Sequence, residues 1–210
     1  MTTLYRLDCT AAEIAQRFGA RVGDDPWTGG YVAPLGFAPV VTAGREFIAG
    51  PRPAGGRLEP RITPRLWGVL PPPSAHDPTR RITSVRNTDS PFWIGNLRNS
   101  EFRCLVPATA VMLWGSGTDY EGRRLKHWFA APGQRIFAMA GVWKDEDVPA
   151  FAVLALDARG AAKEAGCKSM PLILPDSEDT RQAWLHGGWD KARDVIGRAA
   201  FDLDPLPSPG

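Results

Sequence analysis

The 210-residue sequence predicts an α+β fold with a mainly antiparallel, curled or barrel-like β-sheet core and peripheral helices. Most of the chain consists of short apolar segments bounded by Gly, Pro, Asn or Asp, the pattern of strands separated by turns. Gly (22 residues) and Pro (20 residues) are frequent, which favours turns over long helices. No break in composition marks a second domain. We therefore expect one domain over residues 1–204 and a frayed, proline-rich tail over residues 205–210.

The first element is expected to be a helix that begins after Thr10. Thr10 and Glu13 have the spacing of a capping box, in which each side chain satisfies a free backbone N–H group of the first turn. Ile14 and Phe18 share one helical face, and Gly19 ends the helix. The strands expected after it are Gly30–Ala33, Pro39–Ala43, Arg45–Ala49, Leu66–Leu70, Ile82–Arg86, Phe102–Pro107, Ala110–Trp114, His127–Ala130, Arg135–Trp143, Phe151–Leu156 and Pro171–Leu174. Further helices are expected at Ser90–Leu97, Asp157–Ala165, Asp176–His186 and Trp189–Gly197.

Composition and motifs argue against several classes of protein. No apolar run approaches the ~18–20 residues that cross a bilayer, and the N-terminus does not resemble a secretory signal. The three cysteines are too few and too scattered for a disulfide framework, which favours the cytoplasm. The three histidines are far apart, and no Gly-rich phosphate loop is present. We therefore expect neither a metal nor a cofactor.

Charge is distributed unevenly along the chain, although the formal net charge is only +2. Residues 45–104 contain ten arginines, no lysine and five acids, whereas residues 145–210 contain seven basic and twelve acidic residues. The planar arginine fork suits phosphate and can stack on bases, so a nucleic-acid partner is one interpretation of the basic segment. A solvated, arginine-rich surface is the other.

Two residue types leave a structural and a functional interpretation open. The eight tryptophans can fill the core or stack on bases, and Trp67, beside Gly68, is the best candidate for stacking. Cys167 is followed by Lys168, whose charge could lower the pKa of a thiol and make Cys167 reactive. The sequence does not choose between these interpretations.

Five motifs follow one another in a familiar order. They are Pro64–Pro71 (PRLWGVLP), Ser84–Trp93 (SVRNTDSPFW), Arg103–Ala108 (RCLVPA), Phe137–Trp143 (FAMAGVW) and Met170–Leu174 (MPLIL). This succession resembles the SOS-response-associated peptidase (SRAP) family, and more closely a phage-like branch with an Arg-Asn-x-x-Ser-Pro segment. The resemblance covers about Leu4 to Leu174. It implies an SRAP-like fold, binding of single-stranded DNA, and covalent capture of abasic sites.

In that family the capture is made by an N-terminal cysteine, whose amine and thiol form a thiazolidine with the sugar aldehyde. An asparagine, a glutamate and a histidine assist by proton transfer and sugar binding. In this sequence the cysteine position is Thr2, and the three assisting positions are Ser84, Leu113 and Cys167. A threonine hydroxyl is a far poorer nucleophile than a thiol, so we expect covalent capture to be weakened or lost.

The positions that meet DNA in the family are better retained. The resemblance implies DNA contacts for Trp67, Arg86 and Pro34, although Arg86 could instead form a structural ion pair. Ser84, at the position of the family's asparagine, is a further candidate for DNA contact. The leading hypothesis is a protein, expected to be monomeric and without a membrane partner, that binds single-stranded or abasic DNA.

Two alternatives remain. One is an abasic-site crosslinking enzyme that uses the N-terminal amine of Thr2, with Cys167 in the role of the histidine. The other is a non-catalytic, phage-related protein-interaction module. Whether the chain is an enzyme is therefore left open by the sequence.

Overall fold

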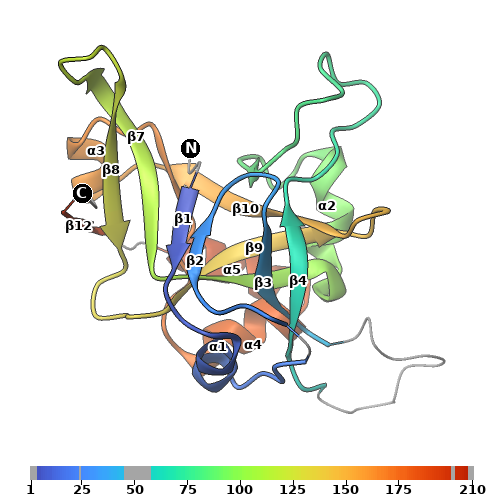
Figure 1. The fold of residues 1–210 in the computed structure, drawn as a ribbon. Helices are drawn as coiled ribbons and strands as arrows, with labels where there is room; N and C mark the ends of the chain where they lie inside the picture. The colour runs from blue at the N-terminus through green and yellow to red at the C-terminus, as the bar shows by residue number, and fades with distance from the viewer. Residues whose placement is uncertain (1–3, 24, 45–57, 200–201, 208–210) are drawn as a thin grey trace.

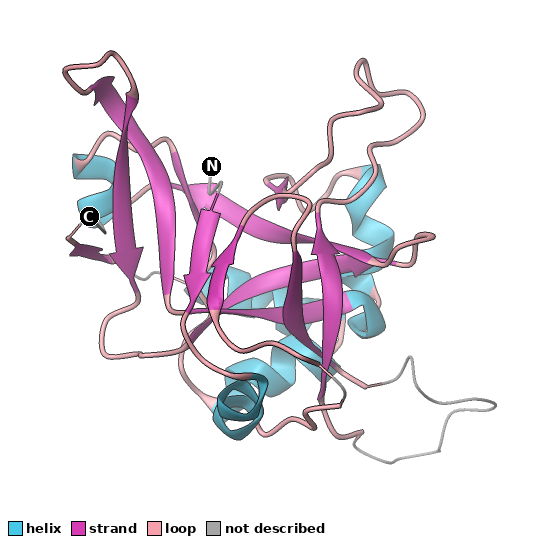
Figure 2. Cartoon of the chain, in the orientation of Figure 1, coloured by secondary structure: helices cyan, strands magenta, loops and turns pink. Residues whose placement is uncertain are grey.

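The computed structural model describes residues 4–23, 25–44, 58–199 and 202–207, and confirms the predicted α+β fold with its curled sheet core (Figure 1). These residues form two mostly antiparallel sheets, with helices at the periphery (Figure 2). The helices are α1 (Ala11–Phe18), α2 (Pro91–Arg98), α3 (Gly160–Glu164), α4 (Glu178–His186) and α5 (Trp189–Arg198).

The smaller sheet has five strands in the order β12-β8-β7-β1-β2. All of its neighbouring strands are antiparallel, and the β7–β8 hairpin forms its longest pairing. The strands are β1 (Leu4–Leu7), β2 (Gly30–Val32), β7 (Ala110–Thr118), β8 (Arg124–Ala130) and β12 (Asp204–Leu206).

The larger sheet curls into a ring. Its strands follow the order β11-β10-β4-β3-β6-β9, and β9 pairs again with β10, so that five of them close on one another; β5 pairs with β10 outside this path. Closure on one side depends on a parallel pairing of only two residue pairs between β10 and β4, so the ring is not a true barrel. The strands are β3 (Phe37–Thr42), β4 (Arg61–Trp67), β5 (Ser84–Val85), β6 (Arg103–Ala108), β9 (Phe137–Lys144), β10 (Ala150–Asp157) and β11 (Ser169–Pro171).

Helix α1 confirms the capping box. The Glu13 backbone N–H donates to Thr10 Oγ1 at 3.2 Å, and the Thr10 backbone N–H donates to Glu13 Oε2 at 2.8 Å. Gly19 ends the helix with φ 61°, a left-handed conformation that glycine adopts without steric cost. The buried face carries Ile14 and Phe18, as their spacing predicts.

Four strands depart most from the prediction. β11 (Ser169–Pro171) shares only Pro171 with the expected Pro171–Leu174, in which Ile173 forms an isolated bridge to Met139. β4 lies upstream of the expected Leu66–Leu70, because Pro64 faces Pro39 across the pair and neither residue needs to donate a ladder hydrogen bond. β1 was not predicted. The tail expected to fray after Asp204 instead begins with β12, which pairs with β8 and places Leu206 against Trp128. The strand expected at Arg45–Ala49 lies outside the described residues.

The main core takes residues from both sheets, at consecutive positions in β6 and β9 and at alternate positions in β1. Tyr5 and Leu7 of β1 point into it, whereas Leu4 packs in a separate cluster with Met112 and Trp128. Strand alternation therefore gives the five-stranded sheet two packed faces. In the described part of the chain, no helix combines the length and apolarity needed to cross a bilayer.

Candidate nucleic-acid interface

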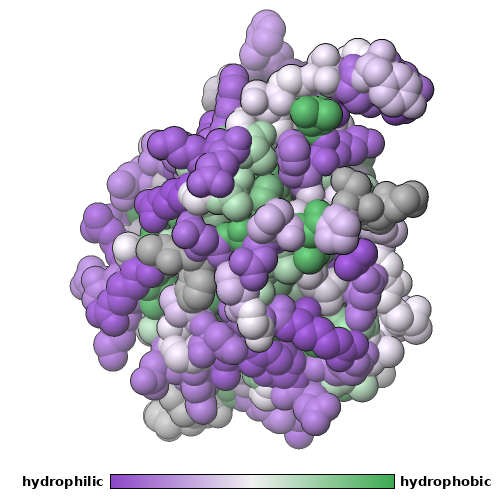
Figure 3. Space-filling view, turned by 90° about the vertical axis from the view of Figure 1, so that its left-hand side faces the viewer, coloured by the Kyte–Doolittle hydropathy of each residue, from purple (hydrophilic) through white to green (hydrophobic). Residues whose placement is uncertain are grey.

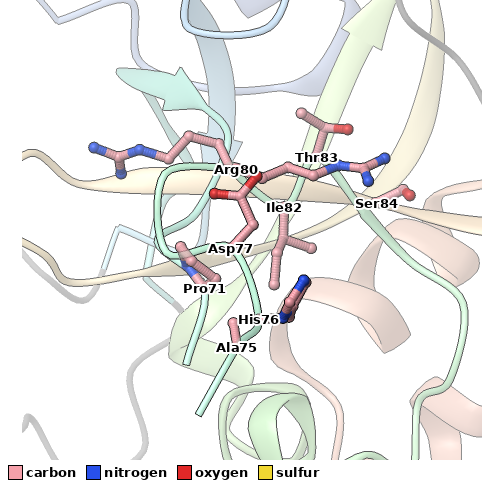
Figure 4. Close-up of a pocket in the computed structure, with 9 residues that line it drawn as sticks. Pro71, Ala75, His76, Asp77, Arg80, Ile82, Thr83 and Ser84 are labelled. Atoms are coloured by element: carbon pink, nitrogen blue, oxygen red, sulfur yellow. The ribbon is translucent and has the colours of Figure 1, made fainter. Parts of the chain in front are cut away.

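An arginine-bearing pocket of about 380 Å³ lies where β4 leads into β5 (Figure 4). The connecting loop is closed by paired backbone hydrogen bonds between Val69 and Ile82 (3.0 and 2.8 Å). Nine residues line the pocket: Pro71, Ala75, His76, Asp77, Arg80, Arg81, Ile82, Thr83 and Ser84. Six of the nine can donate or accept a hydrogen bond through a side chain, so the pocket suits a polar ligand.

Ser84 contributes a polar group without a partner in this pocket. Its backbone is fixed by the parallel pairing of β5 with β10, in which Ser84 is opposite Val153. Its Oγ atom is buried and has no hydrogen-bond partner among the described residues. A buried hydroxyl without a partner costs about 1–3 kcal/mol, and a ligand that bonds to it recovers part of this cost.

The two arginines of the pocket have different surroundings. Arg81 pairs with Glu146 at 3.4 Å, and this carboxylate also accepts a hydrogen bond from the Leu70 backbone N–H at 3.0 Å. Arg80 is exposed, and no ion pair to it occurs among the described residues. The nearby Asp77 carboxylate accepts bonds from Thr79, which lower its pKa and keep it charged. Arg80 is thus the cation of this pocket that is most available to an anion.

Arg86 follows β5 and lies on the surface beside the pocket strand. Its guanidinium is 3.8 Å from the Asp157 carboxylate, and the two side chains are 54% and 97% exposed. Ion pairs with such exposure are worth about 0–1 kcal/mol, so little would be lost if a phosphate replaced Asp157. Of the two roles left open by the sequence, the exposure of this ion pair favours a phosphate contact.

Trp67 is a core residue rather than a surface platform. It is 1% exposed, its ring packs edge-on against Tyr5 at 5.1 Å, and it stacks with Phe151 at 6.3 Å. Its Nε1–H donates to the Thr83 carbonyl at 3.0 Å. The stacking hypothesis for Trp67 is therefore corrected: the indole supports the pocket strand from inside the core and cannot reach a base.

Pro34 lies at the exposed turn between β2 and β3. The next residue, Leu35, has φ 67°, a conformation rare for a leucine, and is held there because its N–H donates to the Trp67 carbonyl at 2.9 Å. Leu35 and Phe37 are more than half exposed. The turn therefore presents apolar side chains to solvent and is fixed to β4 close to the pocket.

A family model described as SOS response associated peptidase (SRAP) matches residues 1–202. The chain belongs to this family. SRAP proteins are associated with DNA damage and abasic sites, and the match confirms the resemblance drawn from the five motifs. A comparison with curated proteins gives no match.

Solved structures confirm the SRAP-like fold. A protein of Bacteroides thetaiotaomicron has 16% identity and a TM-score of 0.68, covering 98% of this chain and 92% of that one. A protein of Bordetella bronchiseptica has 15% identity and a TM-score of 0.66, covering 98% and 99%. A phage-related protein of the same organism has 14% identity and a TM-score of 0.69, covering 97% and 93%. At these identities the likeness concerns the fold alone.

The positions that match the reactive residues of SRAP proteins have little chemical capacity here. Thr2 lies outside the described residues. Leu113 is fully buried in β7 and belongs to the main core. Cys167 is 6% exposed, and burial raises the pKa of its thiol, while Arg124 lowers it less. The thiol is thus protonated near pH 7, and Lys168 does not activate it.

His127 is a polar group near these positions that the family resemblance does not mark. It lies directly opposite Leu113 in the β7–β8 pairing, so both side chains lie on the same face of the sheet. Its Nε2 atom is buried and has no hydrogen-bond partner among the residues that the structure describes. A side chain at Gly115 would come within 2.5 Å of this atom, so glycine is required there. Within the described ranges, no three His, Cys, Asp or Glu side chains form a metal site.

The raised pKa of Cys167 predicts slow alkylation. Burial also raises the pKa of Cys9 to about 11, and all three cysteines are buried and outside any disulfide. At pH 8 we expect iodoacetamide to modify the folded protein more than about tenfold slower than a free thiol, because the thiolate is the reacting form. Mass spectrometry would measure the rate, and the urea-unfolded chain is the control. Rapid modification of Cys167 alone would show that this thiol is activated.

Proposed function

We propose that this SRAP-family protein binds single-stranded DNA, including strands with abasic sites, in the context of DNA damage. The observation that carries the proposal is the pair of available guanidinium groups, Arg80 and Arg86, near the orphan hydroxyl of Ser84. Phosphates bind arginine through two parallel hydrogen bonds, and the Ser84 Oγ offers a further polar contact. The exposed turn at Pro34 supplies apolar contact area close by.

The proposal includes loss of the family's covalent capture. A thiazolidine needs a thiol beside an amine, and Thr2 supplies no thiol. At the assisting positions, Leu113 carries no proton and burial keeps the thiol of Cys167 protonated. Because the three buried cysteines form no disulfide, we also propose that the protein works in the reducing cytoplasm.

Charge reversal tests the binding site. For Arg80→Glu/Arg86→Glu we expect affinity for a fluorescent 30-nucleotide oligothymidylate to fall by about tenfold or more, and the slope of log affinity against log salt to become shallower by about two. Fluorescence anisotropy between 50 and 300 mM salt measures both. Arg193→Glu in α5, another exposed arginine, is the control and should change affinity less than about twofold. If the wild-type protein does not bind, the interaction-module alternative is favoured.

The same oligonucleotide with one abasic site tests the chemistry. After incubation and borohydride reduction, we expect no covalent adduct on a denaturing gel. A borohydride-dependent adduct would instead show an imine with an amine of the protein. If acetylation of the N-terminal amine, which leaves an amide nitrogen that cannot form an imine, then abolished the adduct, the crosslinking-enzyme alternative would replace the proposed loss of capture. A control peptide with an N-terminal cysteine, which forms a thiazolidine with the abasic aldehyde, would verify that this aldehyde is intact.

A further inference from the structure

The five-stranded sheet has a second face on which aromatic side chains form a row. Tyr31 of β2 packs edge-on against Trp128 of β8, with ring centroids 5.7 Å apart. Trp128 lies opposite Met112 of β7, and Trp114 is two residues further along the same strand and on the same face. Leu4, Trp114 and Leu206 are partly buried around this cluster. We call this surface the outer sheet face.

Two cations lie over the exposed end of the row. The Arg124 guanidinium is 5.5 Å from the Trp114 ring centroid, and the Lys126 ammonium is 5.6 Å from it. Both side chains are exposed, and within the described ranges neither forms an ion pair. Among the described residues, the Arg124 guanidinium donates one hydrogen bond, a long one of 3.4 Å to the Gly115 carbonyl.

The other cations of this region are already neutralised. Arg123 pairs with Asp119 at 3.0 Å and with Glu121 at 2.7 Å. Arg6, which shares the outer sheet face, pairs with Asp8 at 2.7 Å. The positive charge that remains for a ligand is therefore concentrated at Arg124 and Lys126, beside Trp114. On the side of the molecule that carries β8 and β12, the surface is largely hydrophilic, with small hydrophobic areas between (Figure 3).

The spacing of the aromatic rings and the two cations suits a flexible, negatively charged chain that carries flat rings. Tyr31 is opposite Arg6, which is opposite Ala110, and Trp114 is four residues beyond Ala110. With strands ~4.8 Å apart and ~3.4 Å per residue, Tyr31 and Trp114 are roughly 17 Å apart, a span for a few nucleotides. Aromatic side chains combined with unpaired cations are the usual means of holding a single strand without sequence preference.

We propose that the outer sheet face is a second binding surface for single-stranded nucleic acid, in which Arg124 and Lys126 hold phosphates while Tyr31 and Trp114 contact bases. The inference rests on the proposed function, since it extends DNA binding beyond the pocket. The two surfaces belong to different sheets: the pocket joins β4 to β5, whereas the outer sheet face lies on β2, β7 and β8. An acidic peptide would use the cations but would gain little from the aromatic row.

The test compares two charge reversals of identical size. Arg124→Glu/Lys126→Glu should weaken binding of the 30-nucleotide oligothymidylate by about tenfold and make the salt slope shallower by about two. Lys191→Glu/Arg193→Glu in α5 has the same spacing and charge change, on exposed residues outside both surfaces, and should have less than about a twofold effect. Tyr31→Ala should weaken binding by about fivefold without altering the salt slope, because it removes a stacking group and no charge. Circular dichroism would confirm that each variant is folded.

Combining these variants with Arg80→Glu/Arg86→Glu separates this inference from the proposed function. If only the pocket variant weakens binding, the outer sheet face is not a binding surface and the proposed function stands. If only the outer-face variant does, the inference stands and the pocket is not the binding site. Additive losses support both, and absence of binding by the wild type overturns both. Equal binding by Tyr31→Ala and the wild type, with displacement of the strand by polyglutamate, would indicate an acidic-peptide site and overturn the inference.

Discussion

Replacing Trp67 by alanine should lower the free energy of unfolding by about 3–5 kcal/mol, the usual cost of removing a large buried ring. Trp67 is 1% exposed and packs between Tyr5 and Phe151. The substitution also leaves the Thr83 carbonyl without the indole N–H that it accepts at 3.0 Å. Urea unfolding followed by circular dichroism would measure the loss.

Two control variants separate a core role from a binding role. Trp67→Phe keeps an aromatic ring and should cost less than the alanine variant, by retaining most of the contact with Tyr5. Tyr31→Ala removes a ring that is 53% exposed and should change stability by less than about 1 kcal/mol. A Trp67→Ala protein with unchanged stability but weakened DNA binding would restore the stacking hypothesis.

Local signals in the sequence predicted the elements that depend on local chemistry. The capping box of Thr10 and Glu13 and the helix stop at Gly19 each act within one turn of helix, and both are present. The strands of the β7–β8 and β9–β10 pairs also carry their own apolar pattern and punctuation. Such features need no knowledge of what packs against them.

The elements that were missed depend on distant partners. β12 has only three residues, Asp204–Leu206, with a proline in the middle. It forms a strand because its backbone pairs with the edge of β8. β4 extends through Pro64 because its partner has a proline at the facing position. Neither condition can be recognised from the segment alone, since both concern hydrogen bonds to residues far along the chain.

The sequence named only some of the residues that the structure brings together at the candidate site. The family motif identified Ser84 and Arg86, but the pocket also needs Arg80, which the loop between β4 and β5 brings to the same cavity. The family motif also predicted a DNA contact for Trp67, but this residue is buried and packs in the core. A motif records which residues recur together, whereas burial decides whether a side chain can touch a ligand.

Replacing Arg103 by alanine should have an effect of similar size, about 3–5 kcal/mol, because it removes a buried charge that satisfies several carbonyl groups. The side chain is fully buried. Its Nε–H donates to the Trp184 carbonyl at 2.5 Å, one Nη donates to the Leu97 carbonyl at 2.8 Å, and the other donates to the Gly187 carbonyl. The guanidinium also lies 5.7 Å from the Trp184 ring centroid.

These carbonyls belong to the C-terminal turns of two helices. Leu97 is in the last turn of α2, and Trp184 and Gly187 are at the end of α4, where carbonyl groups lack partners within the helix and carry partial negative charge. One guanidinium at the start of β6 therefore holds two helix ends against the closed sheet. Without it, each carbonyl left buried and unpaired costs about 1–3 kcal/mol.

Graded substitutions test whether hydrogen bonding or volume is responsible. Arg103→Lys keeps the charge but cannot reach three carbonyls in one plane, so we expect an intermediate loss in urea unfolding. Arg103→Met keeps most of the volume without a donor and should be nearly as unstable as the alanine variant. If the free energy of unfolding of Arg103→Met instead matched that of the wild type, the contribution of Arg103 to stability would come from packing alone. Arg193 of α5 is exposed, so the free energy of unfolding of Arg193→Ala should remain within about 0.5 kcal/mol of that of the wild type.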